Sequence, residues 1–198
     1  MRKSGWVGVA AVALTAGCAS GSAAMNGSAA PGGDAMAGWS QASREAAADM
    51  RAKYGAPDEV TATSMVWHGN GPWKRTTISR DEIPHHFPMP HPDVMEQVIN
   101  YRVPPALLDE ITQYDGSVMV ERTKGEMSAR CDKEGANFLA LNLAHEIVGG
   151  RRTVAEARRM YAEQIMAMKA GRPAPYTERL LFQPQASSMD PDVPAPSM

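Results

Sequence analysis

The sequence has few of the motifs by which enzymes and nucleic-acid-binding proteins are identified. It contains no Gly-x-Ser-x-Gly nucleophile elbow, no glycine-rich phosphate loop and no dinucleotide-binding fingerprint. Its 20 basic residues are outnumbered by 22 acidic ones, whereas a nucleic-acid-binding protein normally needs a concentrated basic face. No repeat of fixed period is present, and 198 residues suit one domain with flexible ends. These absences argue against nucleic-acid binding and against the common catalytic scaffolds.

Long apolar runs are also missing, except near the N-terminus. Arg2 and Lys3 precede an uncharged apolar stretch from Trp6 to Ala16. This stretch is too short to span a bilayer as a permanent helix, and a basic start followed by such a stretch is typical of a signal peptide.

Cysteine occurs only twice, and the first cysteine ends the segment Leu14-Thr15-Ala16-Gly17-Cys18. This segment resembles the lipobox of bacterial lipoproteins, in which Thr15 stands where leucine is usual. The resemblance implies that residues 1–17 are a signal peptide and that Cys18 is acylated and becomes the N-terminus. Ala19, in place of aspartate, implies by the same resemblance the outer membrane, facing the periplasm. The alternative is an ordinary secretory signal that contains a cysteine.

Charge and cysteine content after signal removal fit a lipoprotein. Loss of Arg2 and Lys3 leaves 18 basic against 22 acidic residues, a net charge near −4 with the histidines neutral. Acylation of Cys18 would leave Cys131 alone, so no internal disulfide could form. A single thiol of this kind is either a buried, inert side chain or a reactive site.

Composition divides the mature chain into three parts. Residues 18–38 comprise the lipidated cysteine and a run of small or polar residues, which predicts a flexible tether. Residues 183–198 are rich in proline and predict a disordered tail. The segment between them, residues 39–182, is long enough to form one hydrophobic core.

The first half of this domain predicts a helix followed by a hairpin. Ser40 is a suitable N-cap for an alanine-rich helix over residues 40–54, and Gly55 and Pro57 end it. Strand-like segments at 60–68 and 73–80 flank Gly69-Asn70-Gly71-Pro72, a turn sequence. This helix, Gly-x-Pro break and tryptophan-bearing hairpin resemble small envelope lipoproteins of the SmpA/OmlA type over residues 40–80, without a catalytic motif.

The second half predicts further helices and strands. Residues 83–92 carry several prolines and are expected to form a connector that is neither helix nor central strand. The remaining expected elements are strands at 97–103 and 117–121 and helices at 104–114, 132–148 and 153–170, the last opened by the capping box Thr153-Val154-Ala155-Glu156. Together they predict a single small α+β domain in which about four helices pack on an antiparallel sheet.

Two segments have residues suited to binding. Trp67, Trp73, Lys74 and Arg75 are candidate contacts for a sugar, a peptide or an anionic envelope polymer, through ring stacking and charged hydrogen bonds. The alternative is that the tryptophans anchor the hairpin on the helices while Lys74 and Arg75 face water.

The second segment is the loop from His85 to His91. Its candidate ligands are His85, His86, Met89 and His91, because imidazole nitrogen and thioether sulfur bind copper well. The alternative is a solvated loop whose histidines bind nothing. His145-Glu146 begins a zinc-protease motif, but Gly149 occupies the place of the second histidine, so no zinc site is expected there.

Taken together, these patterns favour a non-enzymatic envelope lipoprotein that is bound to the membrane by its lipid. Its domain is expected to bind another envelope protein or a cell-wall polymer, or to support assembly, with no cofactor and no nucleic acid. A periplasmic copper-binding protein that uses residues 85–91 is the first alternative, and an enzyme of unidentified type is the second.

Overall fold

The computed structural model describes residues 36–195 and contains one antiparallel sheet with helices on one face. Cys18, the expected signal peptide and tether residues 19–35 lie outside the described residues. The sheet has the order β1-β2-β3-β4-β6-β5. Its strands are β1 (Glu59–Val60), β2 (Ser64–His68), β3 (Arg75–His85), β4 (His91–Asn100), β5 (Val118–Glu121) and β6 (Glu126–Cys131). The four helices are α1 (Gln41–Tyr54), α2 (Leu108–Tyr114), α3 (Glu134–Val148) and α4 (Val154–Lys169), with short 3₁₀ turns at Pro105–Leu107 and Pro175–Thr177. The α+β prediction is confirmed.

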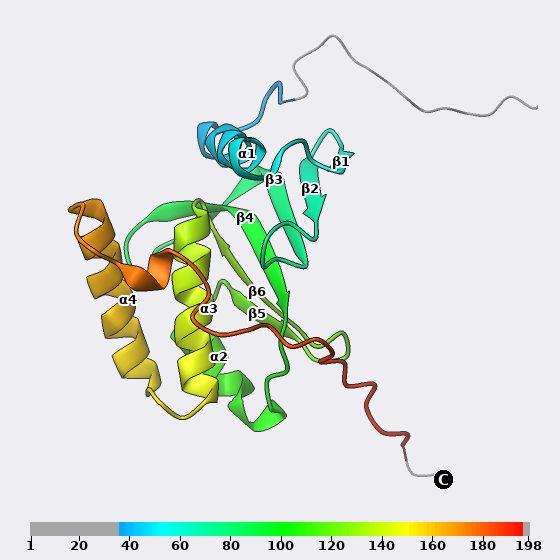
Figure 1. Ribbon diagram of the computed structural model, residues 1–198, viewed down its shortest axis with the longest axis vertical. Helices are drawn as coiled ribbons and strands as arrows, with labels where there is room; N and C mark the ends of the chain where they lie inside the picture. The colour runs from blue at the N-terminus through cyan, green and yellow to red at the C-terminus, as the bar shows by residue number, and fades with distance from the viewer. Residues whose placement is uncertain (1–35, 196–198) are drawn as a thin grey trace, which may run out of the picture. The chain divides into compact units, whose positions relative to one another are not determined.

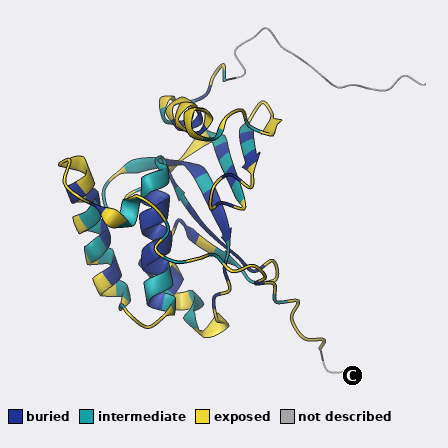
Figure 2. Ribbon diagram, viewed as in Figure 1, coloured by how far each residue is buried: buried dark blue, intermediate teal, exposed yellow. Residues whose placement is uncertain are grey.

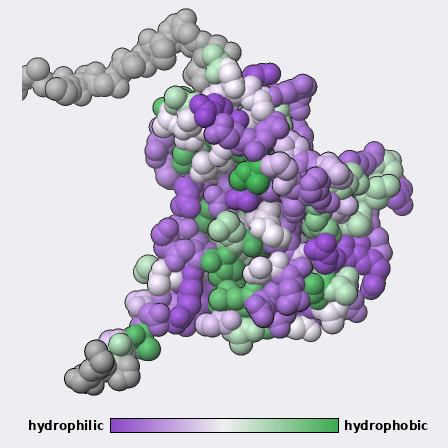
Figure 3. All heavy atoms as spheres, turned by 180° about the vertical axis from the view of Figure 1, so that it is seen from behind, coloured by the Kyte–Doolittle hydropathy of each residue, from purple (hydrophilic) through white to green (hydrophobic). Residues whose placement is uncertain are grey.

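The helices form a second layer on the sheet. Helix α1 packs on β3 and β4, α3 packs on β4, β5 and β6, and α4 packs on α3 (Figure 1). Figure 2 shows β4, β6 and the inner side of α3 as mostly buried, while β1 and the outer sides of α1 and α4 are exposed. The opposite face of the molecule is largely hydrophilic, with a central band of apolar surface (Figure 3). No helix between residues 36 and 195 is both long and apolar enough to cross a membrane.

Helix α1 begins and ends as the sequence predicts. The Ser40 side chain accepts a hydrogen bond from the backbone N–H of Ser43, which satisfies a free donor at the helix start. Gly55 ends the helix with φ 84°, a left-handed conformation that glycine adopts without strain. The inner face of α1 buries Ala46, Ala47 and Met50 in a cluster with residues of β2, β3 and β4. Trp39, just before the helix, is buried in the same cluster.

The last two helices follow their sequence signals closely. Helix α3 buries ten of its residues against the sheet and α4, and two of the ten are asparagines. Helix α4 begins with the predicted capping box, in which Thr153 and Glu156 satisfy each other's backbone N–H groups. The predicted bounds differ from the observed ones by at most two residues at each end.

The prediction of an irregular connector over residues 83–92 is corrected. Strand β3 continues to His85 and β4 begins at His91, with Pro84 opposite Pro92. We call residues 83–93 the histidine ribbon. Prolines are tolerated because β2 pairs with β3 only as far as Ser79, and β6 joins β4 only from Met95. The outer edges of the ribbon therefore lack a neighbouring strand that would need the missing N–H group.

Other strands also differ from expectation. The strand predicted at 97–103 is β4, which starts earlier, at His91, and ends at Asn100. Strand β6 was not predicted, because Glu126, Ser128 and Arg130 make the segment look polar. A tight turn was expected at Asn70-Gly71, but the connection is longer and runs from His68 to Arg75, with positive φ at Gly69 and Gly71.

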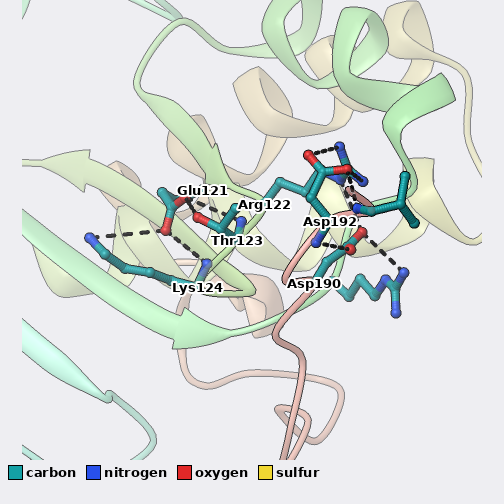
Figure 4. A network of polar contacts seen from close by, with 8 residues as sticks. Glu121, Arg122, Thr123, Lys124, Asp190 and Asp192 are labelled. Carbon is teal, nitrogen blue, oxygen red and sulfur yellow. Dashed lines mark hydrogen bonds and ion pairs between the residues drawn. The ribbon is translucent and has the colours of Figure 1, made fainter. Parts of the chain in front are cut away.

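The C-terminal tail differs from the disordered segment expected from residue 183. Asp190 pairs with Arg122 at 2.9 Å and with Arg102 at 3.1 Å (Figure 4). The Ser188 hydroxyl donates a hydrogen bond to the carbonyl of Gly125. The backbones approach so closely here that any residue other than glycine at position 125 would place its Cβ atom 2.0 Å from the Ser188 carbonyl oxygen. Charge pairing and one close backbone approach therefore order a segment that has little apolar content.

Candidate functional site

The tryptophan surface predicted from the sequence is contradicted, because both indole rings are buried. Trp67 donates its Nε1–H to the carbonyl of Gly55 at 3.0 Å and packs under α1. Trp73 donates to Glu134 Oε1 at 2.7 Å and stacks on Phe138 with 4.7 Å between ring centroids. The rings belong to two different core clusters, so they form no joint ligand surface. The anchoring alternative is the correct one.

Lys74 and Arg75 are also engaged within the domain. Lys74 Nζ lies 2.8 Å from Glu126 Oε1, and Arg75 Nη2 lies 3.3 Å from Glu126 Oε2. The Glu126 side chain is largely buried, and these two cations hold its pKa below the usual value although burial acts in the opposite direction. The two basic residues therefore neutralise a carboxylate of the sheet.

The histidine ribbon brings two of the four predicted metal ligands together and adds a third. His85 and His91 lie opposite each other across β3 and β4, and Asp93 is two residues further along β4. Since side chains alternate along a strand, His91 and Asp93 share one face. His85 Nδ1 lies 3.5 Å and His91 Nε2 lies 3.2 Å from Asp93 Oδ1. All three ligand atoms lie within 4.8 Å of one another. We call these residues the His–Asp cluster.

The three facing atoms are buried without a hydrogen-bond partner among the described residues. This applies to His85 Nδ1, His91 Nε2 and Asp93 Oδ1. The nitrogen–oxygen separations are those of ion pairs, but the atoms are not aligned for hydrogen bonds. An unsatisfied buried polar atom costs about 1–3 kcal/mol, so three in one place need an explanation.

The outward-facing atoms of the same side chains do have acceptors or donors nearby. His85 Nε2 lies 3.5 Å from Asp115 Oδ1, and His91 Nδ1 is 2.8 Å from the carbonyl oxygen of Met89. Asp93 Oδ2 lies 3.7 Å from Arg130 Nε. In metal sites, the second nitrogen of each histidine usually donates to a carboxylate or a backbone carbonyl, which fixes the ring. His91 has this arrangement through the Met89 carbonyl, whereas His85 Nε2 and Asp93 Oδ2 form ion pairs and Arg130 Nε lacks a hydrogen-bond partner among the described residues.

The local charge favours a cation at the cluster. Asp93 and Asp115 are 2% and 1% exposed, and Arg130 is the nearby cation paired with Asp93. The Asp93 carboxylate and the Cys131 thiol raise the pKa of His91 to about 11, against the effect of burial. Burial raises the pKa of Asp115, while hydrogen bonds from Ser117 act in the opposite direction. A proton on His91 and a bound metal ion are two ways to supply positive charge here.

The other two predicted ligands do not join the cluster. His86 is exposed, and the sulfur of Met89 lies 2.8 Å from Lys169 Nζ. Asp93 was not predicted as a ligand, because it follows the expected connector over residues 83–92; a strand starting at His91 would have placed His91 and Asp93 on one face. At His145, Nδ1 pairs with the Tyr101 hydroxyl and the ring stacks on Phe182.

A pocket of about 240 Å³ adjoins the cluster. It shares His91 with the cluster and also contains Cys131, whose side chain is buried and whose Sγ lies 3.4 Å from Asp132 Oδ1. Its other lining residues come from the 88–90 loop, the two residues before α3, and helices α3 and α4: Pro88, Met89, Pro90, Asp132, Lys133, Ala136, Tyr161, Ile165, Met168 and Lys169. The pocket is therefore mostly apolar, with cations at Lys133 and Lys169.

No family model, no curated protein and no solved structure matches this chain, so the site is interpreted from its own geometry.

Proposed function

We propose that this chain is a lipid-anchored lipoprotein of the bacterial envelope whose α+β domain binds a divalent transition-metal ion at the His–Asp cluster. One observation carries the metal-binding part. Three buried ligand atoms converge within 4.8 Å of one another with no hydrogen-bond partner among residues 36–195, while the outer nitrogen of His91 is fixed by the Met89 carbonyl. The protein acts by binding, without a catalytic step of its own, and the His–Asp cluster replaces the tryptophan surface as its binding element.

Two of the three ligand-atom separations in the cluster suit a small ion with tetrahedral geometry, and all three atoms lie within 4.8 Å of one another. Zinc bonds to nitrogen and oxygen are about 2.0–2.2 Å long, which places neighbouring ligand atoms roughly 3.3–3.6 Å apart. The two nitrogen–oxygen separations from Asp93 are 3.5 Å and 3.2 Å. Magnesium and calcium prefer sets made of oxygen alone. We therefore infer a metal of the zinc class.

The copper alternative keeps two of its four predicted ligands. Loss of the Met89 sulfur and of His86 removes the soft ligand that would favour copper(I). Copper(II) binds most nitrogen and oxygen sites more tightly than zinc does, so affinity alone does not separate the two metals. Two imidazoles and a carboxylate are ligands that zinc takes, and we use zinc as the test metal for this donor set.

Zinc titration of the purified full-length protein in detergent tests this function. Wild type should bind one equivalent, and His85→Ala or Asp93→Asn should remove tight binding. His86→Ala is the matched control, since it deletes an exposed imidazole next to His85 and should leave binding unchanged. If all four proteins bind zinc equally, or if wild type binds none, the cluster is a buried ion-pair network and the proposal fails.

Membrane fractionation tests the anchor separately. Wild type should sediment with the membrane fraction, and Cys18→Ser should be released or retained only as an uncleaved precursor. Equal release of both proteins in soluble form would contradict acylation at Cys18. This result would not bear on the metal site.

A further inference from the structure

The His–Asp cluster offers three protein ligands, and a tetrahedral ion takes four. Sites that leave the fourth position to water are usually catalytic, whereas sites with four protein ligands are structural or serve for storage. The identity of the fourth ligand therefore decides what the proposed metal site can do. This question rests on the proposed function.

The sheet register places Cys131 next to the cluster. Cys131 is the last residue of β6 and pairs with Met95 of β4, so it points to the same face as Met95 and Asp93. Asp93 and Cys131 are diagonal neighbours at the end of this ladder. Diagonal positions are about 7–8 Å apart, which is too far for two short side chains to touch but suits two ligands of one ion.

The surroundings of the thiol also point to the cluster. Cys131 and His91 line the same pocket, at its wall next to the cluster. Asp93 is 98% buried at the side-chain level, and its Oδ1 has no hydrogen-bond partner within the described chain. A nearly fully buried carboxylate oxygen without a hydrogen bond and a thiol on the same face of the sheet are complementary parts of a zinc site.

We propose that Cys131 is the fourth ligand and that the 240 Å³ pocket beside it is the route by which the ion enters. In the structure the thiol faces Asp132, and it turns towards the cluster when the ion binds. The S–H bond breaks, a sulfur–metal bond forms, and the proton leaves to solvent. The resulting set of two imidazoles, one carboxylate and one thiolate leaves no open position, in agreement with a protein that binds metal without catalysing a reaction.

Cobalt(II) reports this ligand directly, because thiolate coordination gives a strong sulfur-to-cobalt charge-transfer band in the near ultraviolet. The full-length chain with Cys18→Ser has Cys131 as its only cysteine. It should show this band together with the visible bands of tetrahedral cobalt. Adding Cys131→Ser should abolish the charge-transfer band while cobalt still binds. Zinc affinity should fall by more than about 100-fold, since even second-shell changes cost 10–100-fold.

Two further results separate this inference from the function on which it rests. Saturating zinc should slow alkylation of Cys131 by iodoacetamide, and it should not do so in the Asp93→Asn variant. If cobalt binds to the Cys18→Ser protein without a charge-transfer band, Cys131 is not a ligand and the fourth position is open, while the metal site stands. If no cobalt or zinc binds, the proposed function itself fails. Cys131→Ala should match Cys131→Ser in all these measurements, which excludes an effect of the serine hydroxyl.

Discussion

The tryptophan hairpin, residues 64–80, and the histidine ribbon, residues 83–93, are adjacent in the chain and both looked like binding segments in the sequence. In the hairpin, the polar tips of both indoles have hydrogen-bond partners, at Gly55 and Glu134. In the ribbon, three buried polar atoms converge without a hydrogen-bond partner among the described residues, whereas the hairpin has a single such atom, Asn70 Oδ1. Residue type alone did not separate these cases. The difference teaches that a convergent group of unsatisfied buried ligand atoms, and not a single one, marks a candidate site.

The largest expected effect is a loss of stability caused by a substitution in the tryptophan hairpin. Trp73→Ala removes a fully buried ring that stacks on Phe138 and leaves Glu134 without one of its donors. We expect it to lower the free energy of unfolding by about 3–5 kcal/mol, as measured by urea denaturation. Zinc stoichiometry at low temperature should not change. If the folded Trp73→Ala variant lost zinc binding, the hairpin would contribute to the metal site, and the distinction between a structural hairpin and a binding ribbon would be wrong.

The next effect concerns the histidine ribbon and appears only with metal. Zinc at 100 times its dissociation constant should raise the free energy of unfolding of wild type by about 2.7 kcal/mol. Asp93→Asn keeps the shape of the side chain but removes its charge, so the increase should disappear. Denaturation curves with zinc and with a chelator provide the measurement. An identical increase in wild type and Asp93→Asn would place the ion elsewhere.

A smaller effect is expected from the pH dependence of Glu134, the acceptor for the hairpin. Burial alone would raise the pKa of Glu134, but hydrogen bonds from Lys53, Tyr54 and Trp73 hold it below its usual value of 4.5. A carboxylate with a lowered pKa stabilises the fold above about pH 4.5, and this stabilisation is lost as the pH falls through the folded-state pKa.

Glu134→Gln should therefore cost about 1.5–3 kcal/mol at pH 7, the range for hydrogen bonds to a charged group. The difference from wild type should shrink as the pH falls below 4.5. Urea denaturation at several pH values measures it. A constant difference from pH 7 to pH 3 would show that the charge of Glu134 has no part in the effect.

The smallest effect is expected at the surface of the hairpin. Lys74→Ala removes a 41% exposed side chain from an ion pair, and Arg75 still pairs with Glu126. We expect a change of 0–1 kcal/mol in the free energy of unfolding. Binding to an anionic polysaccharide should be equally weak in both proteins. A clear loss of such binding in Lys74→Ala would restore the hairpin as a ligand surface.

Most of the fold could be predicted from the sequence, because local sequence signals determine most of its helices and strands. Ser40, Gly55 and the Thr153–Glu156 pair set helix ends through their own backbone chemistry, and the alanine and leucine stripes set the buried faces. Strand β6 could not be predicted, because alternate residues along it are polar and its pairing with β4 depends on residues far away in the chain. The ordered tail escaped because its contacts are long-range ion pairs to Arg102 and Arg122.

The site was only half predictable for the same reason. His85 and His91 stand out by their residue type, whereas Asp93 and Cys131 gain meaning only from the strand register. Asp115 follows α2 and reaches His85 through the tertiary fold. Sequence spacing could suggest that histidines gather in the ribbon. It could not show which of their nitrogen atoms remain without a partner.

The central claim is that a metal ion occupies the space between His85 Nδ1, His91 Nε2 and Asp93 Oδ1. Crystals of the zinc-loaded protein, measured on both sides of the zinc absorption edge, test it most directly. We predict one strong anomalous peak about 2.0–2.2 Å from all three atoms. An anomalous map without a peak at these atoms, or with zinc bound only at exposed residues such as His86, would contradict the claim.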